Sequence, residues 1–146
     1  MSEKKLLYFG HPVNVYGTSL EEGLLAEIGE AFAGWDILNP SGPEHEEGYQ
    51  RYKREGKRGM QYFFQEVLPN CEGGIFLPFL DGMFGKGVAG EAEWLLERNK
   101  PVWTISVARE CSITRQLLFP ENRILSVEET RERIRFPDGS SRPYWS

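Results

Sequence analysis

The sequence is poor in cysteine, has no long apolar run and carries no excess of positive charge. Its two cysteines, Cys71 and Cys111, lie at no spacing typical of a metal site, and they fit a reducing compartment better than a disulfide framework. No apolar run approaches the ~20 residues that span a bilayer. The formal net charge of −5 argues against broad electrostatic binding to nucleic acid. We therefore expect a cytoplasmic protein with no membrane partner, no nucleic-acid partner and no metal.

Short apolar runs alternate along the chain with amphipathic stretches. The chain has 146 residues, of which 40% are hydrophobic and 27% charged, and this balance is typical of a folded domain. No repeat, low-complexity tract or linker divides it. We therefore expect one domain over 1–146, with an irregular tail at 137–146.

This alternation predicts the order of strands and helices that is typical of parallel sheets. Strands are expected at five apolar runs, 6–9, 36–40, 74–79, 101–105 and 123–126. Ser19 and Glu22 form a capping box for the first helix, which Gly34 ends. Further helices are expected at 46–55, 60–68, 88–99 and 128–135. These elements predict an α/β protein, a Rossmann-like (flavodoxin-like) three-layer sandwich with a mostly parallel five-stranded sheet.

Sheets of this kind bind ligands at the carboxyl ends of their strands, which directs attention to two loops, 11–18 and 81–87. In the first loop, His11 has the usual character of a loop residue and Pro12 fixes the backbone. Asn14 offers hydrogen bonds to a ligand. The same loop holds two further hydroxyl groups, those of Tyr16 and Thr18.

The second loop carries an acid and a glycine-rich turn into a helix. Asp81 suits contact with a ribose or a base, and a turn role for Asp81 is an equal alternative. Gly85 and Gly87 let the backbone approach a ligand closely, and N–H groups at a helix N-terminus bind anions. Lys86 adds a point charge for a phosphate. An ordinary glycine-rich turn is the alternative, because no standard phosphate-binding motif is present.

Glu91 interrupts an apolar stripe in the helix that follows. Helical spacing from Val88 selects positions 88, 91, 92, 95 and 96, of which only position 91 is charged. A carboxylate facing the sheet is costly unless it is paired or useful. We expect Glu91 to lie in the first turn, where the helix N-terminus favours its ionised form. Such a carboxylate suits attack at an anomeric carbon. The alternative is a glutamate at the helix edge that reaches water.

Residues 51–58 carry five positive charges. This stretch either screens an anionic substrate or, more commonly in proteins, forms a solvated face or a mobile lid. His45 lies among the glutamates at 44, 46 and 47, which is typical of a surface segment rather than a metal site.

Three segments resemble the nucleoside 2-deoxyribosyltransferase superfamily, which includes the 2′-deoxynucleoside 5′-monophosphate N-glycosidases. They are Tyr8-Phe9-Gly10 at the end of the first strand, Gly87-Val88-Ala89-Gly90-Glu91 at the start of a helix, and Lys100-Pro101-Val102 at the start of the next strand. The match covers about residues 5–135. It resembles the family in chain length and in the spacing from the glutamate to the lysine.

The resemblance implies roles for five residues. Glu91 would be the nucleophile that attacks C1′ and displaces the base, and Tyr8 would position it. The loop of Gly10, His11 and Pro12 would hold the sugar and any 5′-phosphate. A homo-oligomer is also implied, together with a nucleoside or nucleotide ligand and no cofactor.

Two other functions are also compatible with the sequence. A non-catalytic domain on the same scaffold would bind or sense a nucleotide, since one fold serves many functions. A glycosidase for another ribosyl compound is the third hypothesis. The base, the sugar and the need for a 5′-phosphate are left undecided by the sequence.

Overall fold

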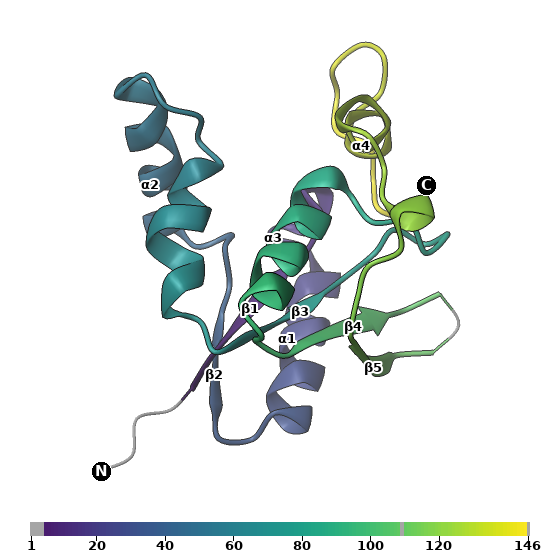
Figure 1. Ribbon diagram of the computed structural model, residues 1–146. Coiled ribbons are helices and arrows are strands. Elements are labelled where there is room, and N and C mark those ends of the chain that lie inside the picture. Colours follow the sequence, from purple (N-terminus) through teal and green to yellow (C-terminus); the bar gives the residue numbers. More distant parts are fainter. Residues whose placement is uncertain (1–4, 109, 146) are drawn as a thin grey trace.

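A five-stranded sheet forms the centre of the computed structural model, which describes residues 5–108 and 110–145 (Figure 1). The expected domain limits, 1 and 146, lie outside these residues. The strands are β1 (Lys5–Gly10), β2 (Trp35–Leu38), β3 (Gly73–Phe76), β4 (Val102–Ser106) and β5 (Ser112–Gln116), in the order β2-β1-β3-β4-β5. β1 to β4 pair in parallel, whereas β5 runs antiparallel to β4. The chain is therefore an α/β protein with a mixed sheet.

The position of the fifth strand was predicted wrongly. Residues 121–123 form a short 3₁₀-helix, and Ile124 makes only an isolated bridge to Phe84. β5 instead comes from the polar run Ser112–Gln116, which has no fully buried residue. An edge strand with both faces partly exposed lacks the apolar signal that marks a central strand. The expected mostly parallel sheet is corrected accordingly to a mixed one.

In the described part of the chain, four α-helices connect or follow the strands: α1 (Ser19–Ala31), α2 (Pro43–Arg54), α3 (Lys86–Glu97) and α4 (Val127–Ile134). The expected capping box of Ser19 with Glu22 does not form: Thr18 is the N-cap of α1, and its hydroxyl accepts from the backbone N–H of Glu21. α4 has a capping box of its own, Ser126 with Glu129. The expected helix at 60–68 is a π-helical segment, η2 (Phe63–Val67), followed by a 3₁₀ turn.

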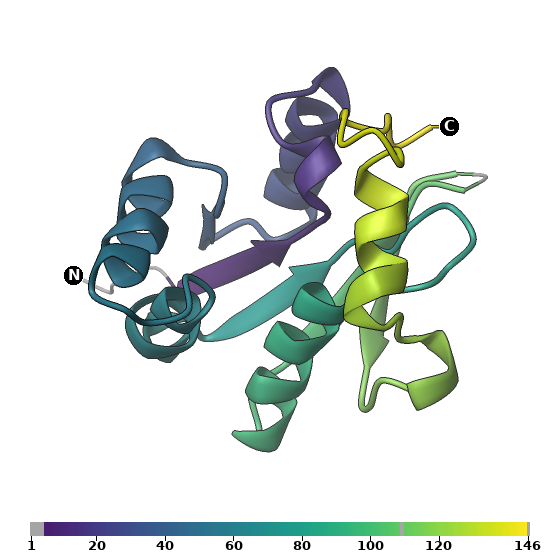
Figure 2. The same cartoon turned by 90° about the horizontal axis from the view of Figure 1, so that it is seen from above.

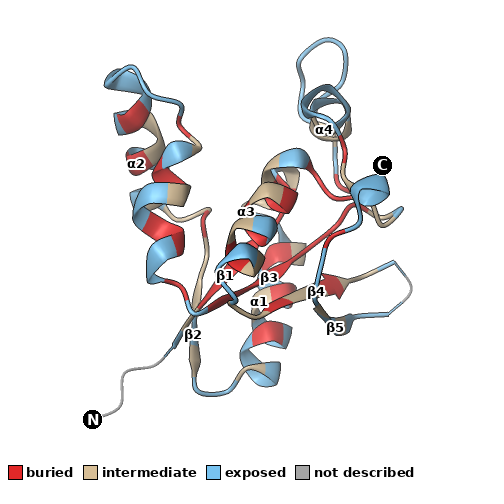
Figure 3. Ribbon diagram, in the orientation of Figure 1, coloured by how far each residue is buried: buried red, intermediate tan, exposed pale blue. Residues whose placement is uncertain are grey.

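Helices cover both faces of the sheet, as Figure 2 shows for α1 and α3. Successive side chains of β1 point to opposite faces of the sheet, and each face has its own apolar layer. Leu7 and Phe9 pack with α1 and bury one layer, while Tyr8 faces α3 and η2 in the other. β3 is buried throughout and β1 is buried from Leu7 to Gly10, as expected for central parallel strands (Figure 3).

Apart from an isolated bridge between Arg135 and Ser141, residues 137–145 of the C-terminal tail form no helix or strand. The tail is nevertheless anchored, because Tyr144 is buried and its hydroxyl donates to the carbonyl of Pro78 at 2.6 Å. Across residues 5–108 and 110–145, none of the helices has the length and apolar character that crossing a bilayer requires.

Candidate functional site

A cavity of about 120 Å³ opens at the carboxyl ends of β1 and β3. β2 and β3 lie on opposite sides of β1, so the chain reverses its winding direction at this point. Ligands of open α/β sheets bind at such a reversal. Both loops that the sequence singled out contribute to the cavity, through His11 and Pro12 after β1 and through Gly85 and Gly87 at the start of α3.

Glu91 lies on the cavity wall and is only 4% exposed. The hydroxyl of Tyr8 donates to its Oε2 at 2.5 Å, and Tyr8 is itself buried. The Oε1 atom accepts no hydrogen bond from the described residues and is not sealed from solvent. Tyr8 therefore fixes the carboxyl by one oxygen and leaves the other facing the cavity.

Gly10 makes this arrangement sterically allowed. A Cβ at Gly10 would collide with the ring of Phe76 and would stand 3.3 Å from Oε1 of Glu91. The last residue of β1 must therefore be glycine for the carboxyl and the ring to lie where they do.

Burial sets the charge state of Glu91. It raises the pKa of this carboxyl to about 8, and the hydrogen bond from Tyr8 acts in the opposite direction. α3 begins at Lys86, so Glu91 is in the second turn rather than the expected first turn. The field of a helix N-terminus falls off within the first turn. The expected ionised carboxylate is thus a carboxyl that is largely protonated at pH 7.

Tyr8 remains a proton donor over the whole physiological range. Burial, and then the neighbouring charge of Glu91, raise its pKa well above the ordinary tyrosine value. The pair therefore has one group that stays protonated and one that ionises near pH 8.

The N-terminus of α3 meets the cavity through backbone rather than through a cation. Gly85 caps the helix, and the N–H of Lys86 donates to the Thr130 hydroxyl at 2.9 Å. The Lys86 side chain is exposed and is not among the residues that line the cavity, so the expected point charge lies elsewhere. Gly87 and Val88 line the cavity, and their N–H groups have no acceptor among the described residues.

His11 is a buried structural residue at the cavity wall, and not an exposed loop residue. Its Nδ1 lies 2.9 Å from the carbonyl of Phe9, and its Nε2 lies 2.8 Å from Oε2 of Glu21. Burial lowers the pKa of His11, whereas its hydrogen bond to Glu21 raises it. Both ring nitrogens are committed, so the imidazole has none free for a ligand.

Asn14 and Asp81 lie outside the cavity. The Asn14 amide donates to the carbonyls of Arg133 and Arg142, at 3.2 and 2.8 Å, and so ties the tail to the first loop. Asp81 accepts from the N–H of Met83 at 3.1 Å and pairs with Arg133 at 2.7 Å. Asp81 thus makes the turn contact that the sequence offered as an alternative, and neither Asn14 nor Asp81 lines the Glu91 cavity.

The cavity also has walls that sequence reasoning did not include. Met60 and Phe63 come from the segment before β3, and Thr130 and Ile134 come from α4. The aromatic-rich composition around Phe63 is a sequence signal that could have indicated its segment. No local signal could have indicated α4, because only the tertiary fold brings it to the cavity. Tyr16, which the sequence offered among the hydroxyl groups, lines the cavity as well.

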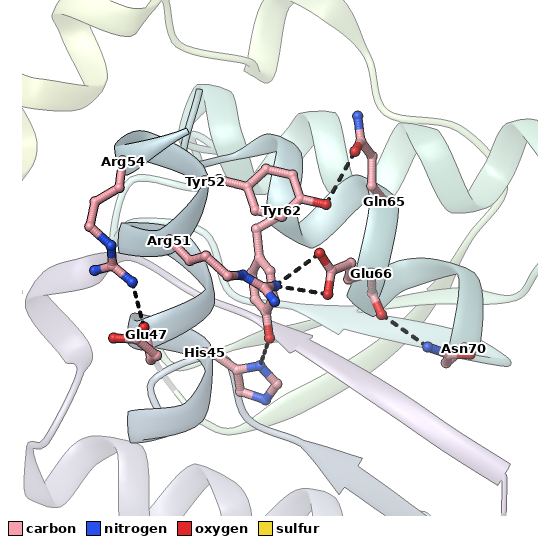
Figure 4. A network of polar contacts seen from close by, with 9 residues as sticks. All are labelled: His45, Glu47, Arg51, Tyr52, Arg54, Tyr62, Gln65, Glu66 and Asn70. Atoms are coloured by element: carbon pink, nitrogen blue, oxygen red, sulfur yellow. Dashed lines mark hydrogen bonds and ion pairs between the residues drawn. The ribbon is translucent and has the colours of Figure 1, made fainter. Parts of the chain in front are cut away.

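Two cations of the basic stretch at 51–58 take part in a surface network on α2 and η2 (Figure 4). Arg51 pairs with Glu66 at 2.9 Å, and Arg54 pairs with Glu47 at 2.7 Å. His45 makes a 2.9 Å hydrogen bond with the Tyr62 hydroxyl in the same network. These contacts agree with the interpretation of the basic stretch as a solvated face of the protein. None of these residues lines the cavity of Glu91.

A second, shallower depression of about 680 Å³ lies between α4 and the tail. Its lining is mainly exposed charged side chains, and it includes none of the buried polar groups described above. The described residues contain no cluster of three or more His, Cys, Asp or Glu side chains that could hold a metal ion. Comparison with known proteins gave no relative, since no family model, curated protein or solved structure matches the chain.

Proposed function

We propose that this protein cleaves or transfers the N-glycosidic bond of a nucleoside or a nucleoside 5′-monophosphate, with Glu91 as the nucleophile. The observation that carries the proposal is the buried carboxyl of Glu91, held by Tyr8 at 2.5 Å on the wall of a cavity at the strand ends. A carboxyl fixed by one oxygen, with the other facing a cavity, is the arrangement that covalent attack on an anomeric carbon requires.

The chemistry runs through two displacements at C1′. The ionised carboxylate attacks C1′, the C1′–N bond breaks, and its electron pair leaves with the base, which takes a proton from water. Water or a second base then attacks C1′ and releases the carboxylate, while its proton passes to the solvent. Two inversions at one carbon retain the configuration. A carboxyl with a pKa of about 8 is roughly 10% ionised at pH 7, so the proposed reaction accelerates at mildly alkaline pH.

The size of the cavity bears on how the substrate is held. Its volume of about 120 Å³ is below the ~300–1,000 Å³ of ordinary ligand pockets. We infer that it takes the sugar, with C1′ beside Glu91, and that the base lies at the open mouth. The free N–H groups of Gly87 and Val88 would then face the sugar or its 5′-phosphate.

We also infer that the chain is a divergent member of the nucleoside 2-deoxyribosyltransferase superfamily. The strand order β2-β1-β3-β4-β5 supports a flavodoxin-like arrangement, which belongs to the wider Rossmann-like class. The contact of Tyr8 with Glu91 supports the roles that the resemblance implies for them. A cytoplasmic homo-oligomer remains a prediction of the same resemblance.

The test uses chromatography to measure the release of free base. The substrates are the four common 2′-deoxynucleosides, the four ribonucleosides and their 5′-monophosphates. Glu91→Gln is the matched variant, because glutamine has the shape of the protonated acid and still accepts from Tyr8. Release by the wild type and at least about a thousandfold less release by the variant supports the proposal. Equal release by the two proteins rules out Glu91 as the nucleophile.

One observation favours a binding or sensing domain as the second candidate. A carboxyl that is mostly protonated at pH 7 is a hydrogen-bond donor to a ligand rather than a nucleophile. Under this alternative, a member of the same panel raises the melting temperature and releases no base during long incubation.

A further inference from the structure

The hydroxyl of Tyr16 is an uncommitted donor on the wall of the Glu91 cavity. Four of the six tyrosine hydroxyls are hydrogen-bonded within the protein, those of Tyr8, Tyr52, Tyr62 and Tyr144. Tyr16 lines the cavity, and its hydroxyl has no partner among the described residues. The hydroxyl oxygen is accessible to solvent, because it is absent from the buried side-chain atoms that lack a hydrogen-bond partner. The hydroxyl is therefore free to meet a molecule in the cavity.

Tyr16 carries its proton at neutral pH. Burial raises its pKa above the ordinary tyrosine value, and the charge of Glu91 raises it further. A protonated phenol can donate one hydrogen bond and accept another, which suits a sugar hydroxyl or a polar atom of a base. Tyr8 already provides the hydrogen bond to Glu91, so Tyr16 is not needed for that purpose.

Glu21 fastens both ends of the loop that carries Tyr16. Its Oε2 lies 2.8 Å from Nε2 of His11, at the start of the loop, and its Oε1 accepts from the N–H of Gly17 at 3.3 Å, at the end. His11 in turn packs against the Tyr16 ring, with 4.8 Å between ring centroids, and stacks on Phe9 at 4.1 Å. The direction of the Tyr16 side chain thus depends on one carboxylate in α1.

The contact between His11 and Glu21 holds a proton. The carbonyl of Phe9 can only accept, so Nδ1 of His11 carries a hydrogen. Nε2 faces a carboxyl oxygen, and that contact is favourable only with a proton between the two atoms. Glutamine at position 21 can make both contacts of Glu21, because its amide donates to a neutral Nε2 and its oxygen accepts from Gly17. Alanine can make neither.

We propose that the Tyr16 hydroxyl hydrogen-bonds the substrate, and that Glu21 is a positioning residue that acts through His11 and Gly17 on Tyr16. The inference rests on the proposed function, since it names a further contact in the same site. It also distinguishes the two tyrosines: Tyr8 holds the nucleophile and Tyr16 holds the substrate.

The experiment measures the affinity of the inactive Glu91→Gln protein for the panel of nucleosides and 5′-monophosphates by titration calorimetry. Tyr16→Phe in this background should weaken binding about three- to tenfold, the effect of one neutral hydrogen bond. Tyr49→Phe is the matched control, because Tyr49 also has no hydroxyl partner in the described chain and lies outside the cavity. It should bind like the parent.

A double-mutant cycle tests the role of Glu21. Glu21→Ala should weaken binding by a similar factor, Glu21→Gln should restore it, and Glu21→Ala should add little once Tyr16 is phenylalanine. Melting curves confirm that each variant is folded, and Tyr16→Phe alone keeps the test decisive if Glu21→Ala does not fold. Unchanged affinity in Tyr16→Phe overturns the substrate contact. If the affinity losses of Tyr16→Phe and Glu21→Ala multiply in the double variant, the two residues act independently, and the positioning role of Glu21 is overturned. If no panel member is bound or cleaved even by the wild type, the proposed function fails together with this inference.

Discussion

The hydroxyl of Tyr8 in β1 lies 2.5 Å from the carboxyl of Glu91 in α3, although 83 positions separate the two residues in the sequence. The contact joins β1 to the helix that follows β3, the strand beside β1 at the winding reversal of the sheet. It also opposes the effect of burial on the Glu91 carboxyl, which otherwise favours the neutral form. The pair therefore links the position of the carboxyl to its charge.

The first prediction concerns the pH dependence of activity. If ionised Glu91 is the nucleophile, kcat/KM for base release rises as pH increases and levels off above a pKa of about 8, because only the deprotonated carboxyl attacks. The measurement is kcat/KM between pH 5 and 9.5. A rate that instead falls above pH 8 would identify the protonated carboxyl as the reacting form, which is incompatible with nucleophilic attack.

The same titration affects stability. The pKa of Glu91 is raised from 4.5 to about 8 on folding, so between these values the folded state binds a proton that the unfolded state has released. The contribution to stability is fully present below pH 4.5 and is lost as pH rises through 8. Relative to Glu91→Gln, the free energy of unfolding of the wild type should fall by up to about 1.4 kcal/mol per pH unit in this window.

Urea unfolding of both proteins at pH 5, 6, 7 and 8 measures the difference. Because every other titrating group is common to the two proteins, its effect cancels in the comparison. A difference that does not vary with pH would mean that Glu91 is not buried in the protonated form.

Tyr8→Phe should shift the charge of Glu91 further toward the neutral form. The hydrogen bond from Tyr8 lowers the pKa of Glu91, so its removal raises that pKa and moves the rise of kcat/KM to higher pH. We expect activity at pH 7 to fall by about tenfold or more. Tyr144→Phe is the control, since it removes a buried hydroxyl bonded to Pro78 that lies outside the cavity. An equal pH profile for Tyr8→Phe and the wild type would contradict the prediction.

Local patterns were enough to predict some of the residues that line the Glu91 cavity. Glu91 stood out because a charge at an apolar helical position must be buried or near an edge, and both burial and the contact with Tyr8 agree with this. Gly85 and Gly87 were found because a glycine-rich turn before a helix places backbone at the ends of the strands, and both line the cavity.

The remainder depended on contacts between distant segments. Asn14 is occupied by carbonyls of α4 and the tail, more than a hundred positions away. β5 is an exposed edge strand whose composition resembles that of a loop. The charge state of Glu91 was predicted wrongly because it depends on how fully the carboxyl is desolvated. The spacing of residues along one helix gives no information on that desolvation.

The last prediction concerns the end of β1. Gly10→Ala should destabilise the fold by about 1–3 kcal/mol, because its Cβ collides with the ring of Phe76 and the buried strand cannot move away. Gly29→Ala is the matched control: Gly29 lies in α1, is exposed and has nothing within 4 Å of an added Cβ. There the same substitution should stabilise the protein by about 0.5–1 kcal/mol, since alanine is the better helix former.

Thermal or urea unfolding compares the two variants, and base release reports on the site. Because the added Cβ of Gly10→Ala also stands 3.3 Å from Oε1 of Glu91, activity should fall more than the loss of folded protein explains. Full activity of a folded Gly10→Ala protein would mean that the space beside Oε1 is not where the substrate approaches. Since Oε1 is the carboxyl oxygen that Tyr8 leaves free, that result would also count against attack by Glu91 from this side.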